Sequence, residues 1–280
     1  MLWPVAGRQK DLAPDAEYLS KLALFLHASR DANFAAIDPD GERMKTIGLI
    51  GGMSWESTQV YYRLINEQVR KECGGLHSAR LILYSVDFHD IERLQHAGNW
   101  DAAGNLLANA GCALEAAGAR FLVLCTNTMH KVSAFIEEAT TIPLLHVIDA
   151  TADAIHAAGL SRVGLLGTRF TMEQDFYRDR MSLQRGVEVM IPGPEDRESV
   201  HRIIYEELCQ GEVKASSRAT YQRIIGDLAE RGAQGIILGC TEIGLLIKPG
   251  DAALPLFDST EIHAVAAVAY ALAEPDLPSY

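Results

Sequence analysis

The second half of this 280-residue chain repeats the first half at a nearly constant distance. The segment Ile47-Gly-Leu-Ile-Gly-Gly-Met is echoed 116 residues later by Val163-Gly-Leu-Leu-Gly-Thr-Arg. Thr126-Asn-Thr is echoed 114 residues later by Cys240-Thr-Glu, and each of these polar segments precedes a proline-led apolar run. We therefore predict two α/β lobes related by a pseudo-twofold axis.

Short apolar and β-branched runs alternate with helical segments along most of the chain, which predicts mostly parallel, doubly wound sheets. The predicted strands are 46–50, 80–86, 120–124, 144–147, 162–166, 187–191, 234–238 and 254–257, and the predicted helices include 56–71, 101–117, 195–210, 215–231 and 260–273. Asp149 and Asp258 are predicted to begin the helices after the fourth and eighth strands.

The repeat also predicts how the chain is divided. The first lobe should comprise residues 44–145 together with a returning C-terminal helix at 258–275, and the second lobe residues 146–257. Residues 1–43 differ in pattern from the rest and end in a turn-rich segment, so we predict an N-terminal extension outside both lobes.

Charge and composition exclude several classes of function. The net charge of −12 argues against a nucleic-acid partner, because phosphate binding needs a surplus of lysine and arginine. No apolar run approaches the roughly 20 residues that a membrane span requires. The five cysteines form no Cys-x-x-Cys pair, and the nine histidines show no metal-ligand spacing. We therefore predict a cytoplasmic protein without a metal site.

A pseudo-twofold axis sets equivalent loops opposite one another and creates a cleft that can bind a small ligand. It would place Thr126 against Cys240. A thiol has a pKa of about 8.5, and a helix N-terminus after Cys240 would lower that pKa and make the thiol a usable base. A buried structural cysteine is the alternative for Cys240. Cys125 lies within the strand and is predicted to point into the core.

Short polar residues flank both candidates and suit a carboxylate ligand, although helix capping alone would also explain them. These residues are Asn127, Thr128 and Thr241. Glu242 either orients the Cys240 thiol or is a first-turn acid favoured by the helix dipole. The loop after Gly51-Gly52 lacks a nucleotide-binding pattern and is predicted to bring Met53 and Ser54 to the cleft. His130 is predicted to lie on a helix surface, and a position near the Thr126-Asn-Thr segment is the alternative.

These residues resemble the cofactor-independent aspartate/glutamate racemase family. The matching segments are Ile47-Gly-Leu-Ile-Gly-Gly-Met-Ser-Trp-Glu-Ser-Thr, Cys125-Thr-Asn-Thr-Met-His and Gly239-Cys-Thr-Glu-Ile, and the similarity extends from about Met44 to Ala273. The resemblance implies a homodimer that racemises an acidic amino acid without pyridoxal phosphate or any other cofactor. Two residues on opposite faces of the substrate would remove and return the α-proton.

The chain departs from the family pattern at two places. The family has a cysteine in each motif, whereas this chain has Thr126 opposite Cys240, which resembles a branch acting mainly on L-aspartate and L-glutamate. Some relatives also place a lysine just after an Ile-Tyr-Glu segment, where this chain has Cys209 and Gln210, and neither Lys214 nor Arg202 can be assigned the role. Position in the family pattern adds three expected substrate contacts, Ser85, Gln95 and Thr168.

Two other functions remain open at this point. Superfamily relatives with one competent cysteine include decarboxylases of malonate-type acids, in which a lone thiol protonates a carbanion. A second alternative is an amino-acid-binding protein that has lost its chemistry. The sequence does not decide between aspartate and glutamate.

Overall fold

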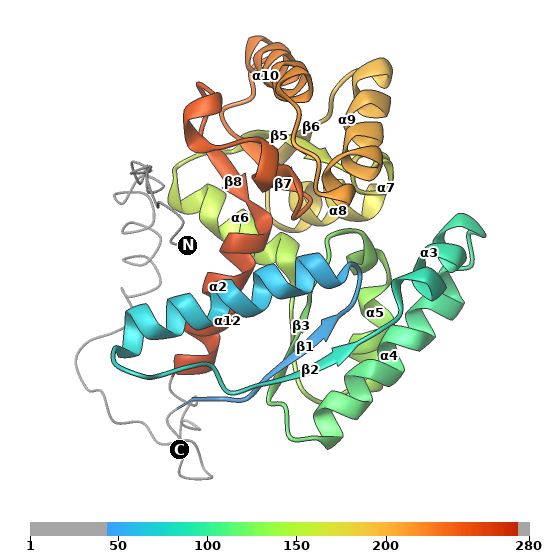
Figure 1. Cartoon of the computed structure of the whole chain (residues 1–280), viewed down its shortest axis with the longest axis vertical. Coiled ribbons are helices and arrows are strands. Elements are labelled where there is room, and N and C mark those ends of the chain that lie inside the picture. Colours follow the sequence, from blue (N-terminus) through green and yellow to red (C-terminus); the bar gives the residue numbers. More distant parts are fainter. Residues whose placement is uncertain (1–43, 274–280) are drawn as a thin grey trace, which may run out of the picture.

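Two parallel four-stranded sheets form the framework of the protein (Figure 1). This computed structural model describes residues 44–273, so the predicted extension 1–43 and the end of the predicted last helix lie outside the described residues. The first sheet has the order β2-β1-β3-β4 and the second β6-β5-β7-β8. Their bounds are β1 Ile47–Gly51, β2 Leu81–Ser85, β3 Phe121–Leu124, β4 Leu144–Leu145, β5 Arg162–Gly167, β6 Glu188–Met190, β7 Ile236–Gly239 and β8 Leu256–Asp258.

The two sheets have the same strand order, which confirms the predicted two-lobed α/β fold. Counted in chain order, each lobe arranges its strands as second, first, third and fourth. The central strands β1, β3 and β7 are buried along their whole length, as expected for parallel strands covered by helices on both faces. Because parallel strands end at the same edge of a sheet, the loops after β1 and β3 lie together, and so do those after β5 and β7.

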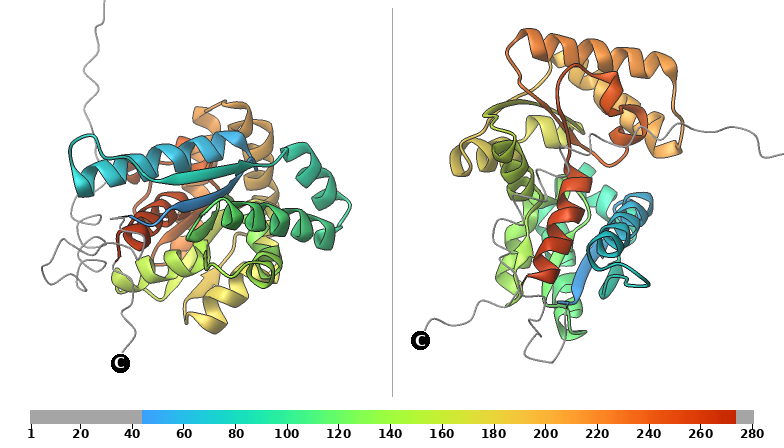
Figure 2. Two further views of the ribbon diagram at one scale, coloured as in Figure 1. Left: turned by 90° about the horizontal axis from the view of Figure 1, so that it is seen from below. Right: turned by 90° about the vertical axis from the view of Figure 1, so that its left-hand side faces the viewer.

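Helices from both ends of the described chain cover the first sheet (Figure 2). Ala264, Ala267 and Val268 of the last helix pack in one apolar cluster with Tyr61 and Ile65. Small alanine side chains allow this close approach. The elements around the first sheet are α2 Trp55–Cys73, α3 Phe88–His96, α4 Trp100–Ala116, the 3₁₀ turn η1 Thr128–Val132, α5 Ser133–Ala139 and α12 Ser259–Leu272.

The second sheet is surrounded by the remaining elements, which share one large apolar cluster. Within residues 44–273, no helix combines the length and the apolar character needed to cross a membrane. The elements are α6 Val147–Ala157, α7 Arg169–Glu173, α8 Asp175–Asp179, the π-helical turn η2 Arg180–Gln184, α9 Pro194–Glu206, η3 Leu208–Gln210, α10 Ala215–Glu230, α11 Ile243–Leu246 and η4 Pro249–Asp251.

Two strand-to-helix connections carry the chain between the sheets, from β4 into α6 and from β8 into α12. Asp258 caps α12 as predicted, because its carboxylate accepts hydrogen bonds from the Thr260 and Glu261 N–H groups. The predicted helix α6 is present, but Asp149 lies in its first turn and does not cap it. Its cap is His146, whose Nδ1 accepts a hydrogen bond from the Ile148 N–H, so β4 ends at Leu145. The imidazole supplies the acceptor that an N-cap aspartate usually supplies.

Candidate active site

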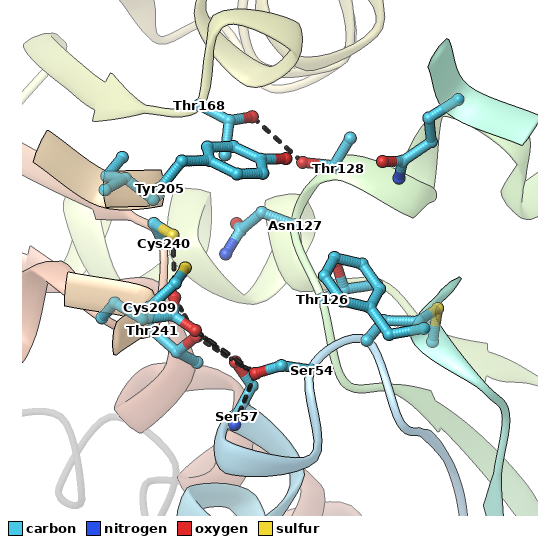
Figure 3. A pocket seen from close by; sticks show the side chains of 16 residues that line it. Ser54, Ser57, Thr126, Asn127, Thr128, Thr168, Tyr205, Cys209, Cys240 and Thr241 are labelled. Atoms are coloured by element: carbon cyan, nitrogen blue, oxygen red, sulfur yellow. Dashed lines mark hydrogen bonds between the residues drawn. The ribbon is translucent and has the colours of Figure 1, made fainter. Parts of the chain in front are cut away.

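The loops at the carboxyl ends of β1, β3, β5 and β7 enclose one cavity between the two sheets (Figure 3). The space among the lining atoms, including open solvent at its mouth, is about 580 Å³. Figure 3 shows Cys240 and Thr126 on opposite sides, with Asn127 between them in this view. The lining consists of Met53, Ser54, Ser57, Phe88, Gln95, Thr126, Asn127, Thr128, Thr168, Ile204, Tyr205, Cys209, Gly239, Cys240, Thr241 and Glu242.

The segment after β3 supplies one wall of the cavity. Cys125 is fully buried in the apolar cluster beneath the sheet, so Thr126 is the residue that reaches the cavity. Among the described residues, none forms a hydrogen bond with the Thr126 hydroxyl, which is therefore available to a ligand. Asn127 donates a hydrogen bond from Nδ2 to Ser259 Oγ at 3.0 Å, while its buried Oδ1 has no partner within residues 44–273. That oxygen can accept a hydrogen bond from a ligand.

A threonine pair joins this wall to the second sheet. The hydroxyls of Thr128 and Thr168 lie 3.1 Å apart, and Thr171 lies 3.2 Å from each of them. Thr168 also caps α7 by accepting a hydrogen bond from the Thr171 N–H. The predicted contacts Thr128 and Thr168 thus come together across the two lobes.

The opposite wall carries Cys240 and a carboxylate that contacts it. Cys240 Sγ donates to Glu242 Oε2 at 2.9 Å, and Thr241 Oγ1 donates to the same oxygen at 2.7 Å. Glu242 Oε1 accepts from Ser57 Oγ at 3.0 Å. Glu242 is buried, so its charge is held by these hydroxyl and thiol donors. This arrangement favours the role of thiol partner over that of direct substrate contact.

The ionisation of Cys240 differs from the expectation. Burial, followed by the negative charge of Glu242, raises the pKa of the Cys240 thiol well above its ordinary value. The predicted helix N-terminus is only the four-residue α11, which begins at Ile243, and it does not offset these effects. Cys240 is therefore a protonated thiol at neutral pH, hydrogen-bonded to the group that can accept its proton.

Two serines from α2 connect the first lobe to this carboxylate. Gly52 has φ +92°, and a Cβ there would lie 2.1 Å from the Val86 carbonyl oxygen, so the loop after β1 requires glycine. The loop then brings Ser54 to the N-cap of α2. Ser57, one turn later, contacts both Glu242 and Thr241. The Ser54-x-x-Ser57 spacing is the sequence signal for this contact, since both side chains lie on the first turn.

Ten of the eleven residues predicted for the site line the cavity, and Ser85 does not. Ser85 is the exposed last residue of the edge strand β2, on the far side of the Gly52 loop. Gln95 does line the cavity, where its amide Nε2 donates to Met129 Sδ at 2.9 Å. His130 is buried rather than on a helix surface. The six lining residues that were not predicted for the site are Ser57, Phe88, Ile204, Tyr205, Cys209 and Gly239.

The charged side chain that lines the cavity is negative. Among the described lining residues there is no lysine or arginine, and Glu242 is the one carboxylate. Lys214 lies on the surface, where it pairs with Glu212 at 2.9 Å, and Arg202 pairs with Glu206. Cys209 lines the cavity, and burial raises the pKa of its thiol to about 12. Within residues 44–273, no three histidine, cysteine, aspartate or glutamate side chains are grouped to hold a metal ion.

Replacing Glu242 by glutamine should lower the pKa of Cys240, because it removes the negative charge that adds to the effect of burial. We expect alkylation of Cys240 by iodoacetamide at pH 8 to become severalfold faster, since the thiolate is the reactive form. Peptide mass spectrometry would measure the rate, with the exposed Cys112 of the same chain as internal standard. An unchanged or slower alkylation of Cys240 would contradict the contact between thiol and carboxylate.

Comparison with known proteins shows the family to which the chain is similar. The family model for Asp/Glu/Hydantoin racemase matches residues 50–267. A crystal structure of a candidate Asp/Glu racemase from Yersinia pestis is 58% identical, with a TM-score of 0.79, and the match covers 82% of this chain and 100% of that one. An aspartate racemase homologue from Pyrococcus horikoshii is 38% identical, with a TM-score of 0.73 and coverage of 81% and 99%.

A curated relative, the broad specificity amino-acid racemase RacX of Bacillus subtilis, is 24% identical over 81% of this chain and 98% of its own length. The family model covers well over half of the chain, and two solved relatives are matched over nearly their full length. The predicted resemblance is thereby confirmed. The chain belongs to the Asp/Glu/Hydantoin racemase family and is an isomerase of the amino-acid racemase class.

Proposed function

We propose that this protein racemises a free amino acid by moving the α-proton between Cys240 and Thr126. The observation that carries the proposal is that both residues line one cavity from equivalent positions, after β3 and after β7. A substrate between them would present opposite faces of its α-carbon to the thiol and to the hydroxyl. No cofactor is needed for this chemistry, and the proposal includes none.

The Cys240–Glu242 contact supports a route for the proton. Glu242 accepts the thiol proton, and the resulting thiolate removes the α-proton from the L-enantiomer. The Thr126 hydroxyl then gives a proton to the opposite face of the carbanion and regains one from water at the cavity mouth. Glu242 returns to that water the proton that it took from the thiol, so both residues and the carboxylate end in their starting states. A threonine hydroxyl is a much weaker acid than a thiol, so the reverse reaction begins less readily. This asymmetry supports the predicted preference for the L-substrate.

The polar residues of the walls are proposed to bind the backbone groups of the substrate. The hydroxyls of Thr128 and Thr168 can donate to the α-carboxylate, whereas the Thr241 hydroxyl already donates its one proton to Glu242. The free Oδ1 of Asn127 can accept from the ammonium group. Withdrawal of charge from the carboxylate stabilises the carbanion, so these contacts assist the reaction as well as binding.

Two kinds of substrate side chain are candidates, an acidic one and a small neutral one. Aspartate and glutamate are predicted from the motifs, and the names of two solved relatives support them. The absence of lysine and arginine among the described lining residues favours a small neutral amino acid instead. A second carboxylate would be buried beside Ile204, Tyr205 and Cys209 without a cation, which costs several kcal/mol. The name of the Bacillus subtilis relative is consistent with this second candidate.

An exchange assay in heavy water decides between the candidates. We would measure α-proton exchange for aspartate, glutamate and a panel of neutral amino acids, in the wild type and in Cys209→Lys. Lysine at 209 supplies the missing cation, so we expect it to raise kcat/KM for acidic relative to neutral substrates by about tenfold, equivalent to 1.4 kcal/mol. Cys209→Met, which fills the space without charge, is the matched control.

The two alternative functions, decarboxylase and binding protein, would each give a different result. Loss of carbon dioxide from a substituted malonate, with no exchange of any amino acid, would identify a decarboxylase. Tight binding of an amino acid without exchange, unchanged in Cys240→Ala, would identify a binding protein. The homodimer remains a prediction from the resemblance, and the cytoplasmic location remains a prediction from composition. The exposed side chains of Trp55 and Tyr62 on α2 offer apolar surface that a second copy would cover.

A further inference from the structure

The position of Thr126 depends on its backbone, because its hydroxyl forms no hydrogen bond with any described residue. Its N–H donates to the Leu124 carbonyl oxygen at 2.8 Å. Its carbonyl oxygen lies 2.7 Å from Nδ1 of His130, four residues later. His130 is 3% exposed, so water does not compete for this bond. A side chain buried beneath the cavity therefore holds the peptide group that follows Thr126.

The hydrogen-bond partners of His130 define its tautomer. A carbonyl oxygen can only accept, so Nδ1 carries the proton that is donated to Thr126. Nε2 lies 3.3 Å from the backbone N of Val147, which can only donate, so Nε2 is unprotonated. Burial and the neighbouring His146 and His263 lower the pKa of His130 well below its ordinary value, which keeps the ring neutral. Both nitrogens are therefore used, and the ring orientation is determined.

His130 joins the catalytic loop to the connection between the lobes. Val147 is the first residue of α6, and it packs in the core of the second lobe. The equivalent position in the second half, 114 residues later, is Gly244, which has no side chain to hold the carbonyl of Cys240. The space there is close to the Asp258 carboxylate, which would lie 2.7 Å from an added Cβ. The histidine support thus belongs to the Thr126 side alone.

We propose that His130 is a positioning residue for Thr126, holding the Thr126 peptide group so that the hydroxyl faces the substrate. The inference rests on the proposed racemase reaction. Thr126 is a weak acid and a weak base, so proton transfer by its hydroxyl is slow even when the hydroxyl is well placed. Any further loss of rate through misplacement would make the reaction on this face ineffective. Displacement of a reacting group by about 1 Å can cost on the order of 10²-fold in rate. His130 acts through the Thr126 backbone and does not line the cavity.

The test compares α-proton exchange from the two enantiomers. Exchange from the L-enantiomer requires only Cys240, which can remove a proton and return a deuteron on the same face. Exchange from the D-enantiomer requires Thr126. We expect His130→Phe, which keeps a ring of similar volume, to lower exchange from the D-enantiomer by about 10- to 100-fold and exchange from the L-enantiomer by less than threefold.

Two further variants separate positioning from general stability. His130→Asn retains a donor near the place of Nδ1 and should restore most of the D-enantiomer exchange. His263→Phe removes another buried histidine of the same cluster, one that contacts Leu145 and Tyr61 instead of Thr126. It should lower the thermal midpoint and leave the ratio of D to L exchange unchanged.

The outcomes are distinguishable. An equal fall in exchange from both enantiomers in His130→Phe, or the same change of ratio in His263→Phe, would assign His130 a structural role only. No exchange in the wild type from any amino acid would refute the proposed reaction instead. Nitrogen-15 NMR of the wild type gives an independent check, since a His130 protonated at Nε2 at pH 7 would contradict the inference whether or not the variants fold.

Discussion

Cys240→Ser is expected to abolish measurable racemisation, lowering exchange from the L-enantiomer by about 10³-fold, within the range that general acid–base groups contribute. Serine keeps the size of the side chain and the hydrogen bond to Glu242, so the wall of the cavity should be preserved. It removes the acidity, because a serine hydroxyl gives up its proton far less readily than a thiol. Hydrogen–deuterium exchange at the α-carbon, followed by proton NMR, measures the effect.

The matched variant on the other wall is Thr126→Cys. It places a thiol on both sides of the cavity. The substitution breaks no hydrogen bond to a described residue, because the Thr126 hydroxyl of the wild type forms none. Exchange from the D-enantiomer should rise towards the rate from the L-enantiomer. Circular dichroism would verify that both variants fold. Equal initial exchange rates from the two enantiomers in the wild type would overturn the asymmetric pair from which both expectations follow.

Acid should destabilise the fold strongly between pH 7.5 and pH 5. Burial lowers the pKa of His263 to about 4, and burial followed by the charge of Arg180 lowers that of His146 to about 2. His130 shifts in the same direction. A histidine whose pKa is lower when folded contributes its full stability above pH 6.5 and loses it as the pH falls, because the unfolded chain then binds more protons.

At pH 5 the loss is about 2 kcal/mol each for His146 and His263, from about 1.5 pH units at 1.36 kcal/mol each, and His130 adds a loss in the same direction. Asp258 opposes this, since burial raises its pKa to about 6 and protonation there favours the folded state by about 1 kcal/mol over the same interval. The net expectation from His146, His263 and Asp258 is a fall of about 3 kcal/mol in the free energy of unfolding, and His130 makes the fall larger.

Urea unfolding at pH 7.5 and pH 5, at one protein concentration, measures this difference. His263→Gln provides the comparison, because glutamine can still donate to the Leu145 carbonyl oxygen but does not titrate. Its own stability at pH 7.5 will be lower. The loss between pH 7.5 and pH 5 should nevertheless shrink by about 2 kcal/mol. A pH dependence identical to that of the wild type would contradict the buried, neutral state of His263.

Local pattern was sufficient to predict the eight strands and the two-lobed arrangement. Each strand is a short apolar run, and the repeated Ile47 and Val163 segments became the equivalent strands β1 and β5. The same pattern failed at His146, because its role as the cap of α6 depends on an imidazole tautomer that spacing does not reveal. Tyr205 and Cys209 were missed for a different reason. They reach the cavity from α9 and η3, and the departure from the family pattern at Cys209 was the one sequence signal that could have placed this segment at the cavity.

The sequence by itself determined the family, the sheets and the pairing of Thr126 with Cys240, because those depend on short-range periodicity and on a repeat of constant length. The tertiary structure alone decided the ionisation of Cys240 and the support of Thr126. The part-buried Cys240 thiol is protonated because it lies beside Glu242 away from bulk water, and the Thr126 peptide group is held by a buried histidine that contacts the start of α6. Burial and contacts between distant segments determine the protonation of Cys240 and the support of Thr126. Neither burial nor such contacts can be derived from the order of the residues.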